Sequence, residues 1–341
     1  MTTELPAGFD SIDALEEFMT TPDEDLVADL AALDGDIIVL GVGGKMGPTL
    51  ARMAKRAAPD KRVIGVARFS EAGLQQKLQN WDIETIACDL LDREAVEKLP
   101  RCDNVIFMAG RKFGTAGALD LTWAMNVHVP AIVADVYRDS RIVAFSTGNV
   151  YPMVDVAGPA PTEQTPAGAI GEYAQSCLGR ERMFEYFSGK HGNAALNIRL
   201  NYAIDMRYGV LWDIGTKVFE GQPVDLTAGH ANVIWQGEAN SRIIRCLRHC
   251  TSPATPINIT GPAIEVRDVA TAFGKHFGKT PELVGTEDAR GWLSDPSYSD
   301  TLLGPLKVPV DTMIAWQADW IAAGRESLNK PTAFDSRDGS F

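Results

Sequence analysis

Long hydrophobic runs are absent from this chain of 341 residues. No apolar run reaches the roughly 18 residues that a membrane-spanning helix needs. The N-terminus, MTTELPAGFD, has neither a basic start nor an apolar block, so it does not predict a secretory signal. With 45% hydrophobic and 23% charged residues, the composition is typical of an ordinary globular protein. The sequence thus predicts no membrane association.

Cysteine is scarce and odd in number. The five cysteines are Cys88, Cys102, Cys177, Cys246 and Cys250. Their scatter favours free thiols in a reducing compartment over a disulfide framework, and we therefore expect a cytoplasmic protein. Cys246 and Cys250 lie near His249, but further ligands are missing, so a helix face with small apolar residues is the better interpretation. No metal site is predicted.

Lysine and arginine are absent from the start of the chain, where the first basic residue is Lys45. Residues 1–36 hold eleven of the 45 acidic residues, which leaves 34 against 32 basic residues in the rest. The remainder is therefore nearly neutral despite the net charge of −13, and no basic stripe predicts nucleic-acid binding. The acidic leader has two interpretations, a site for a basic partner and a solvated helix surface, and we favour the second.

The leader has the pattern of two short helices. SIDALEEFM spaces its apolar residues on one side of a helix. TPDEDLVADLAAL opens with Thr21 and Glu24 in the arrangement of a capping box, with Pro22 at the first helical position.

Strands and helices alternate after the leader. Apolar segments typical of buried strands are IIVLGVGG, RVIGVAR, IETIACD, NVIFMAG, RIVAFST and ALNIRLNY. Stretches that can form helices lie at 47–58, 71–79, 92–98 and 119–138. This alternation predicts an α/β fold with a doubly wound parallel sheet covered on both faces.

The pattern loosens after about residue 203, where PINIT and helices near 266–277 and 310–323 remain. We expect this part to form a smaller lobe interwoven with the sheet domain. The expected organisation is an acidic helical extension at 1–36, a dinucleotide-binding domain at 37–203, mostly a substrate-binding lobe at 204–330, and a tail at 331–341.

A glycine turn follows the first strand. GVGGKMG places Gly41, Gly43, Gly44 and Gly47 directly before a helix, with Lys45 and Met46 among them. Such a turn brings backbone N–H groups and the positive end of the helix dipole to a pyrophosphate. The sequence predicts dinucleotide binding here.

The spacing G-x-x-G-x-x-G resembles the extended short-chain dehydrogenase/reductase family, which includes nucleotide-sugar epimerases and dehydratases. The resemblance covers roughly residues 37–210 and also rests on CDLLD, FMAGRKFG, WAMNVHVP and FSTGNVYP. It implies a Rossmann-type sheet, a homodimer through 119–138 and 173–188, and a nicotinamide cofactor. The cofactor residues it implies, with the glycine turn, are Gly41, Gly43, Gly44, Lys45, Met46, Gly47, Ala67, Arg68, Asp89, Leu90, Met108, Ala109, Gly110, Lys112, Asn126, Ser146 and Tyr173.

The end of the second strand bears on the choice of cofactor. Family members that bind NAD place an acidic residue there, which holds the ribose hydroxyls. This chain has Ala67 followed by Arg68, whose guanidinium can bind a phosphate. NADP(H) is therefore favoured over NAD(H).

Two tyrosines compete for the family's catalytic position, which follows the Ser/Thr signature by about 25 residues in the extended members. By the resemblance Thr147 supplies the catalytic hydroxyl, and Tyr173 follows it by 26 residues, Tyr186 by 39. Tyr186 with Lys190 has the family's Tyr-to-Lys spacing. However, it lies three turns further along the same helix, so we interpret that spacing as a chance match.

Tyr173 departs from the family because Cys177 stands where the family has lysine. A thiol supplies neither the charge that lowers a tyrosine pKa nor a strong donor. Lys112 is our first candidate for a replacement cation. Arg180 and Arg182 are weaker candidates because they are expected to lie displaced around the helix.

Three interpretations follow for Tyr173 and Cys177. In the first, the neutral phenol of Tyr173 acts as an acid with help from Thr147 and Lys112. In the second, the chain binds its cofactor as a sensor without catalysis. In the third, Cys177 is itself reactive, although a small buried residue that fills the space of the lysine is favoured.

The substrate side of the sequence is less specific. RLNYAIDMRYGV supplies Asn201, Tyr208 and Gly209 at places where the family carries an Asn and a Tyr-Gly. Trp212 and Trp235 are candidates for stacking on a sugar ring. We expect an NAD(P)-dependent oxidoreductase or epimerase acting on a hydroxyl or keto carbon of a sugar, sugar acid or nucleotide sugar. The alternative is a non-catalytic dinucleotide-binding sensor or scaffold.

Overall fold

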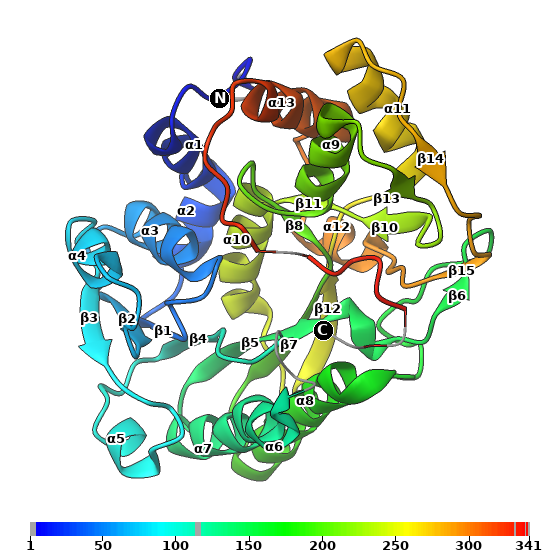
Figure 1. The fold of residues 1–341 in the computed structure, drawn as a ribbon. Coiled ribbons are helices and arrows are strands. Elements are labelled where there is room, and N and C mark those ends of the chain that lie inside the picture. The colour runs from blue at the N-terminus through cyan, green and yellow to red at the C-terminus, as the bar shows by residue number, and fades with distance from the viewer. Residues whose placement is uncertain (1–4, 113–116, 331, 338, 340–341) are drawn as a thin grey trace.

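A seven-stranded parallel sheet forms the centre of the molecule, in the order β12-β7-β5-β4-β1-β2-β3 (Figure 1). The computed structural model describes residues 5–112, 117–330, 332–337 and 339. The sheet strands are β1 (Ile37–Leu40), β2 (Val63–Ala67), β3 (Glu84–Ala87), β4 (Asn104–Phe107), β5 (Arg141–Thr147), β7 (Ala195–Leu200) and β12 (Thr255–Ile259). The predicted doubly wound sheet is confirmed.

One strand departs from the expected division of the chain. PINIT is expected in the smaller lobe, but as β12 it pairs in parallel with β7 at the edge of the main sheet. The reason is burial, because Ile257 and Ile259 join the core cluster under α10 (Gln236–Arg245). The C-terminal part of the chain thus completes the sheet as well as the lobe.

Helices cover both faces of the sheet (Figure 1). One face carries α2 (Glu24–Ala31), α3 (Gly47–Ala57), α4 (Leu74–Gln79) and α10. The other carries α5 (Arg93–Glu97), α6 (Leu119–Trp123), a π-helical segment (Ala124–His128), α7 (Val129–Val136) and α8 (Gly171–His191). These positions match the four predicted helical stretches to within a few residues.

The smaller lobe packs on one edge of the main sheet, the edge at which the parallel strands of that sheet have their carboxyl ends. Its helices are α1 (Ile12–Met19), α9 (Val210–Glu220), α11 (Val266–Phe277) and α13 (Val310–Ala322), whereas α12 (Ser297–Leu303) packs against β12 of the main sheet. Short strands pair as β8 (Ala203–Ile204) with β11 (Ile234–Trp235), β10 (His230–Asn232) with β13 (Ala263–Glu265), β9 (Val224–Asp225) with β14 (Leu283–Val284), and β6 (Val154–Asp155) with β15 (Arg290–Gly291). Trp235, Trp316 and Phe273 lie in its buried core.

The two leader helices form as predicted, but the predicted capping box does not. The N-cap of α2 is Asp23, whose side chain accepts a hydrogen bond from the backbone N–H of Leu26 at 2.8 Å. Thr21 instead donates its hydroxyl to the carbonyl of Glu17 at 2.8 Å, so it belongs to the end of α1. A carboxylate nearer the helix has taken the capping role.

The leader is largely the solvated acidic surface that we favoured, but two of its carboxylates, Glu16 and Asp29, are buried. Three of its carboxylates form ion pairs with arginines and a lysine of this chain: Glu16 with Arg207 and Lys77, Glu17 with Arg52 and Arg56, and Asp29 with Arg245 and Arg248, all at 2.6–2.9 Å. These three carboxylates of the leader therefore pair with the body of the same chain. Among the residues with described positions, no helix has the length and hydropathy needed to cross a membrane.

Candidate functional site

The glycine turn joins β1 to α3, and its backbone is tightly confined. Gly41 has φ +94°, and a Cβ there would come within 2.5 Å of the backbone N of Ala109. A Cβ on Gly47 would come within 2.2 Å of the carbonyl O of Val42. No side chain caps the N-terminus of α3, whose N-cap is Met46. Since the N–H of Gly47 donates to the carbonyl of Gly44 at 3.2 Å and Pro48 has no N–H, the feature that fits a bound pyrophosphate is the positive end of the helix dipole beside the glycine turn.

A cavity of about 290 Å³ opens between this turn, the ends of the central strands and the smaller lobe. The predicted residues that line it are Gly44, Lys45, Met46, Met108, Gly110, Lys112, Ser146, Thr147, Tyr173, Asn201, Tyr208 and Gly209. Residues far apart in the chain are thus brought to one place because parallel strands end at a common edge of the sheet.

Other predicted residues do not line the cavity: Gly41, Gly43, Gly47, Ala67, Arg68, Asp89, Leu90, Ala109, Asn126 and Cys177. Arg68 is exposed at the end of β2. Asp89 is exposed after β3 and accepts a hydrogen bond from the N–H of Leu91 at 3.1 Å. Trp235 is core rather than a stacking surface, since it is 2% exposed. Trp292 lines the cavity instead.

Tyr173 and Thr147 are neighbours, although they come from α8 and from the end of β5. Burial raises the pKa of Tyr173 well above its ordinary value, and the neighbouring Cys177 raises it further. The charge of Arg180 and hydrogen bonding with Thr147 lower this pKa in part. The phenol is consequently neutral at neutral pH and remains a proton donor.

Cys177 lies one helical turn after Tyr173 and is 1% exposed. Burial raises the pKa of its thiol, an effect that the charge of Arg180 only partly opposes. A thiol with a raised pKa is protonated at neutral pH, which does not favour the reactive-thiolate interpretation.

Arg180 lies on the same side of α8 as Tyr173 and Cys177, contrary to the expectation that it would be displaced around the helix. Its side chain is buried and lines the cavity. Nη1 donates to the carbonyl of Phe145 and Nη2 to Oδ1 of Asn126, both at 2.7 Å. The physical reason is helical period, because a residue seven positions on returns to the same face after two turns.

Arg182, the other weak candidate, is indeed directed elsewhere. It is exposed and forms an ion pair with Glu185 at 2.6 Å. Tyr186 is 60% exposed on the outer surface of α8, with the Nζ of Lys190 at 5.9 Å from its ring centroid. Neither residue of the familiar Tyr-to-Lys spacing lines the cavity.

Asn126 connects Arg180 to neighbouring residues of the site through hydrogen bonds. Its Nδ2 donates to the carbonyl of Arg111 and to Oγ of Ser176, both at 2.9 Å, and its Oδ1 accepts from the N–H of Arg111 at 2.8 Å. Asn126 lies in the π-helical segment between α6 and α7. Irregular turns of this kind often mark functional sites.

Lys112 lies near Tyr173, with its Nζ at 5.8 Å from the ring centroid. The Nζ also donates to the carbonyl of Thr332 at 3.1 Å, and burial lowers the pKa of Lys112 to about 8. Thr332 in turn binds the carboxylate of Asp213 on α9 through its hydroxyl. The segment after α13 therefore contacts Lys112 and α9, and Figure 1 shows the C-terminal stretch running from the smaller lobe across the middle of the view.

Comparison with solved structures identifies the architecture. UDP-glucuronic acid 4-epimerase from Bacillus cereus in complex with NAD superposes with a TM-score of 0.71 at 16% identity, over 85% of this chain and 100% of that one. dTDP-glucose 4,6-dehydratase from Bacillus anthracis str. Ames gives 0.72 at 15%, over 85% and 97%. UDP-glucose 4-epimerase from Thermus thermophilus gives 0.68 at 19%, over 83% and 98%. The chain has the fold of the extended short-chain dehydrogenases/reductases.

No protein-family model matches the sequence, and no curated protein matches it. At 15–19% identity the likeness to the extended short-chain fold lies in the backbone, so the site has to be judged from its own residues.

Sequence reasoning missed part of this site. Arg111, Tyr202 and Trp292 line the cavity without being predicted, and Arg180 is ranked too low. For Arg180 the i, i+4, i+7 spacing of Tyr173, Cys177 and Arg180 is a usable signal. Gly110 is another, because a Cβ there would come within 2.3 Å of Nη2 of Arg180. No sequence pattern predicts that Trp292 lines the cavity, because its position depends on tertiary contacts between distant segments.

Proposed function

We propose that this protein is an NAD(P)-dependent oxidoreductase or epimerase acting on a hydroxyl or keto carbon of a carbohydrate-type small molecule. The observation that carries the proposal is the meeting of Tyr173 and Thr147 in one cavity that also reaches the glycine turn. Solved structures of the same fold are named as epimerases and dehydratases in complex with NAD, which supports this class of cofactor and substrate.

The glycine turn and the first turn of α3 would hold the pyrophosphate of the cofactor, and the cofactor supplies the hydride chemistry when bound. We propose NADP(H) over NAD(H). Ala67 ends β2 without a carboxylate, and the guanidinium of the exposed Arg68 is available to a 2′-phosphate.

In the proposed mechanism Tyr173 acts in its neutral form. A neutral phenol can donate its proton to the alkoxide that forms when a keto carbon is reduced. The proposed role of Thr147, whose hydroxyl neighbours Tyr173, is to hold the same oxygen. Oxidation of a hydroxyl needs the phenolate, which burial of Tyr173 disfavours. We therefore expect reduction to be faster than oxidation at neutral pH.

The positive charge that Cys177 cannot supply comes, in this proposal, from Arg180 with Lys112. The charge of Arg180 lowers the pKa of Tyr173, whereas Lys112 lies beside the phenol ring. Cys177 then serves as a small buried residue that leaves space for this arrangement. We therefore propose Arg180, rather than Lys112, as the main replacement for the positive charge of the family's lysine.

A sensor or scaffold without catalysis is the second candidate. The raised pKa of Tyr173 and the thiol at the position of the family's lysine favour it. Both candidates share the cofactor and differ in turnover, so one experiment separates them.

The experiment measures binding of NADPH and NADH by fluorescence titration, and then follows absorbance at saturating cofactor across a panel of keto-sugars, sugar acids and nucleotide sugars. With at least one of them, the enzyme proposal predicts net cofactor oxidation by an oxidoreductase or, because an epimerase returns the hydride to its substrate, interconversion of epimers followed by chromatography. Tight cofactor binding without turnover on the whole panel favours the sensor, and no cofactor binding contradicts both.

A cytoplasmic homodimer through α6–α7 and α8 is also proposed. Leu119, Leu121 and Trp123 on α6 are 37–44% exposed, and Tyr186 on α8 is more exposed still. An apolar surface of this kind suits a self-contact. Light scattering on the purified protein tests it, since a monomeric mass at micromolar concentration contradicts the interface.

A further inference from the structure

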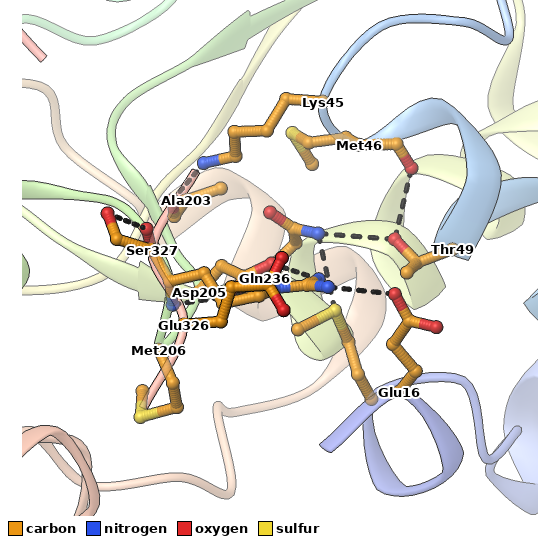
Figure 2. Close-up of polar contacts among 12 residues, drawn as sticks. Glu16, Lys45, Met46, Thr49, Ala203, Asp205, Met206, Gln236, Glu326 and Ser327 are labelled. Atoms are coloured by element: carbon orange, nitrogen blue, oxygen red, sulfur yellow. Dashed lines mark hydrogen bonds and ion pairs between the residues drawn. The ribbon is translucent and has the colours of Figure 1, made fainter. Parts of the chain in front are cut away.

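Lys45 belongs to the glycine turn, but its side chain reaches across to the smaller lobe (Figure 2). Its Nζ donates to the carbonyl of Ala203 at 3.0 Å and lies 3.9 Å from the centroid of the Tyr208 ring. Both partners come from the segment after β7, which leads from the sheet into the smaller lobe. The ammonium group therefore lies at the side of the cavity that Ala203 and Tyr208 line, where the chain enters the smaller lobe.

The charge of Lys45 has no counter-ion within the part of the chain that the structure describes. The nearest carboxylates are engaged elsewhere. Asp205 is held by Arg207 through Nε–Oδ1 at 3.0 Å and Nη2–Oδ2 at 2.8 Å, and Asp213 binds Thr332. An ammonium has three N–H donors, and one of them is accounted for by Ala203. Burial lowers the pKa of Lys45 to about 7, as expected for a cation without a close anion.

The rest of the cavity wall is also positive. Its lining includes Lys45, Arg111, Lys112 and Arg180, and no Asp or Glu among the residues with described positions. Trp292 is buried on the same wall, and its indole N–H has no hydrogen-bond partner among the described residues. Buried donors without acceptors are costly in a protein interior, which points to a ligand that supplies acceptor oxygens.

We propose that Lys45 binds an anionic group, a carboxylate or a phosphate, on the substrate itself, so that the enzyme acts on an acidic sugar. This inference rests on the proposed function and names the substrate class of that site. The glycine turn and the start of α3 provide backbone N–H groups for the phosphates of a dinucleotide, whereas the Nζ of Lys45 lies at Ala203 and Tyr208. The second anion that this cavity accepts therefore comes from the substrate.

The test measures ligand binding by calorimetry, which is independent of turnover. Glucuronate provides the carboxylate, glucose 6-phosphate the phosphate and glucose the neutral control. Each is titrated into the wild type, Lys45→Met, Lys45→Arg and the exposed control Lys98→Gln, with and without NADP⁺. The affinity for NADPH is measured separately by fluorescence, so failure of the proposed function shows as a lack of NADPH binding by the wild type.

We expect the wild type to bind at least one acid more tightly than glucose by about tenfold or more, the usual contribution of a charge-assisted hydrogen bond. Lys45→Met removes this preference, Lys45→Arg keeps part of it, and Lys98→Gln leaves it unchanged. NADPH affinity stays within about threefold in all variants. Which acid is preferred tells a carboxylate from a phosphate.

Three outcomes overturn the proposal. Equal binding of glucose and both acids by the wild type does so even if Lys45→Met fails to fold. Failure of both acids to bind the wild type does so as well. Loss of NADPH affinity in Lys45→Met with acid binding unchanged would assign Lys45 to a cofactor phosphate instead.

Discussion

Buried cations have opposite surroundings in two regions of this molecule. Beneath the smaller lobe, Arg207 pairs with Asp205 and Glu16, and within the sheet domain Arg199 pairs with Glu181, all at 2.7–3.0 Å. At the cavity, the described hydrogen bonds of Lys45 and Arg180 go to carbonyl and amide oxygens and to no carboxylate. In the first region the cations form ion pairs that stabilise the fold. In the second they have no described carboxylate partner, and we propose that they interact with a ligand or with Tyr173.

The two kinds of buried cation also differ in their effect on the free energy of unfolding. A buried ion pair becomes strongly destabilising when one partner is removed, because the other charge is left uncompensated. A buried cation with only neutral partners already carries that penalty in the folded protein. Substitutions in the two regions should therefore change stability in opposite directions and change activity only in the cavity.

Tyr173→Phe should have the largest effect, because it removes the group on which the cavity cations act. If the phenol is the general acid, turnover falls by about 10²–10⁴-fold with NADPH affinity nearly unchanged. Steady-state kinetics and NADPH titration check this. The control is Tyr186→Phe on the outer face of the same helix, and equal losses in both variants would show that Tyr173 has no special role.

Arg207→Met breaks the paired region. Removal of the guanidinium leaves Asp205 and Glu16 buried without its compensation, so the free energy of unfolding should fall by about 3–5 kcal/mol. Denaturant unfolding of the purified variant measures this. A fall of less than about 1 kcal/mol, as for an exposed ion pair, would contradict the assignment of this network to the fold.

Arg180→Met should reduce turnover by about 10–100-fold, since Tyr173 then lacks the charge that lowers its pKa. The pH dependence of the oxidation rate distinguishes an electrostatic role of Arg180 from a structural one. The alkaline rise of the oxidation rate, which reports formation of the phenolate, should move to higher pH in Arg180→Met and return toward its original position in Arg180→Lys. An unchanged profile with a lower rate would assign Arg180 a purely structural role.

Arg68→Asp is the smaller change on the cofactor side. The new carboxylate would repel a 2′-phosphate, so the ratio of NADPH to NADH affinity should fall by about tenfold. Fluorescence titration of both cofactors measures the ratio. A ratio that does not change would remove the present reason for favouring NADP(H).

The sequence is sufficient for predicting the sheet because buried strands and their intervening helices are local patterns. Its spacing also distinguishes Tyr173, which lines the cavity, from the exposed Tyr186. It does not place β12, whose partner β7 is some 60 residues away in the chain, and it does not show that Glu16 and Asp29 meet arginines of the body. Such pairings depend on tertiary contacts between distant segments, which periodicity does not encode.

The site shows the same division. The glycine turn and Thr147 follow from motifs, and Arg180 follows from helical spacing once that spacing is applied over two turns. The direction of the Lys45 side chain does not follow from the sequence, because it is set by Ala203, 158 positions away along the chain. Side chains whose direction is set by such long-range contacts are therefore the least predictable part of the site.

The unfolding free energy of ligand-free Lys45→Met tests the comparison most directly. In the folded protein the pKa of Lys45 is about 7, below its ordinary 10.5, so the unfolded chain binds the proton more tightly. The penalty is complete below about pH 7 and disappears as the pH approaches 10.5. We predict that at about pH 6 Lys45→Met is more stable than the wild type by on the order of 1 kcal/mol, and that the gain vanishes at alkaline pH. A loss of stability at that pH comparable to that of Arg207→Met would show that Lys45 is a structural cation and would contradict the account.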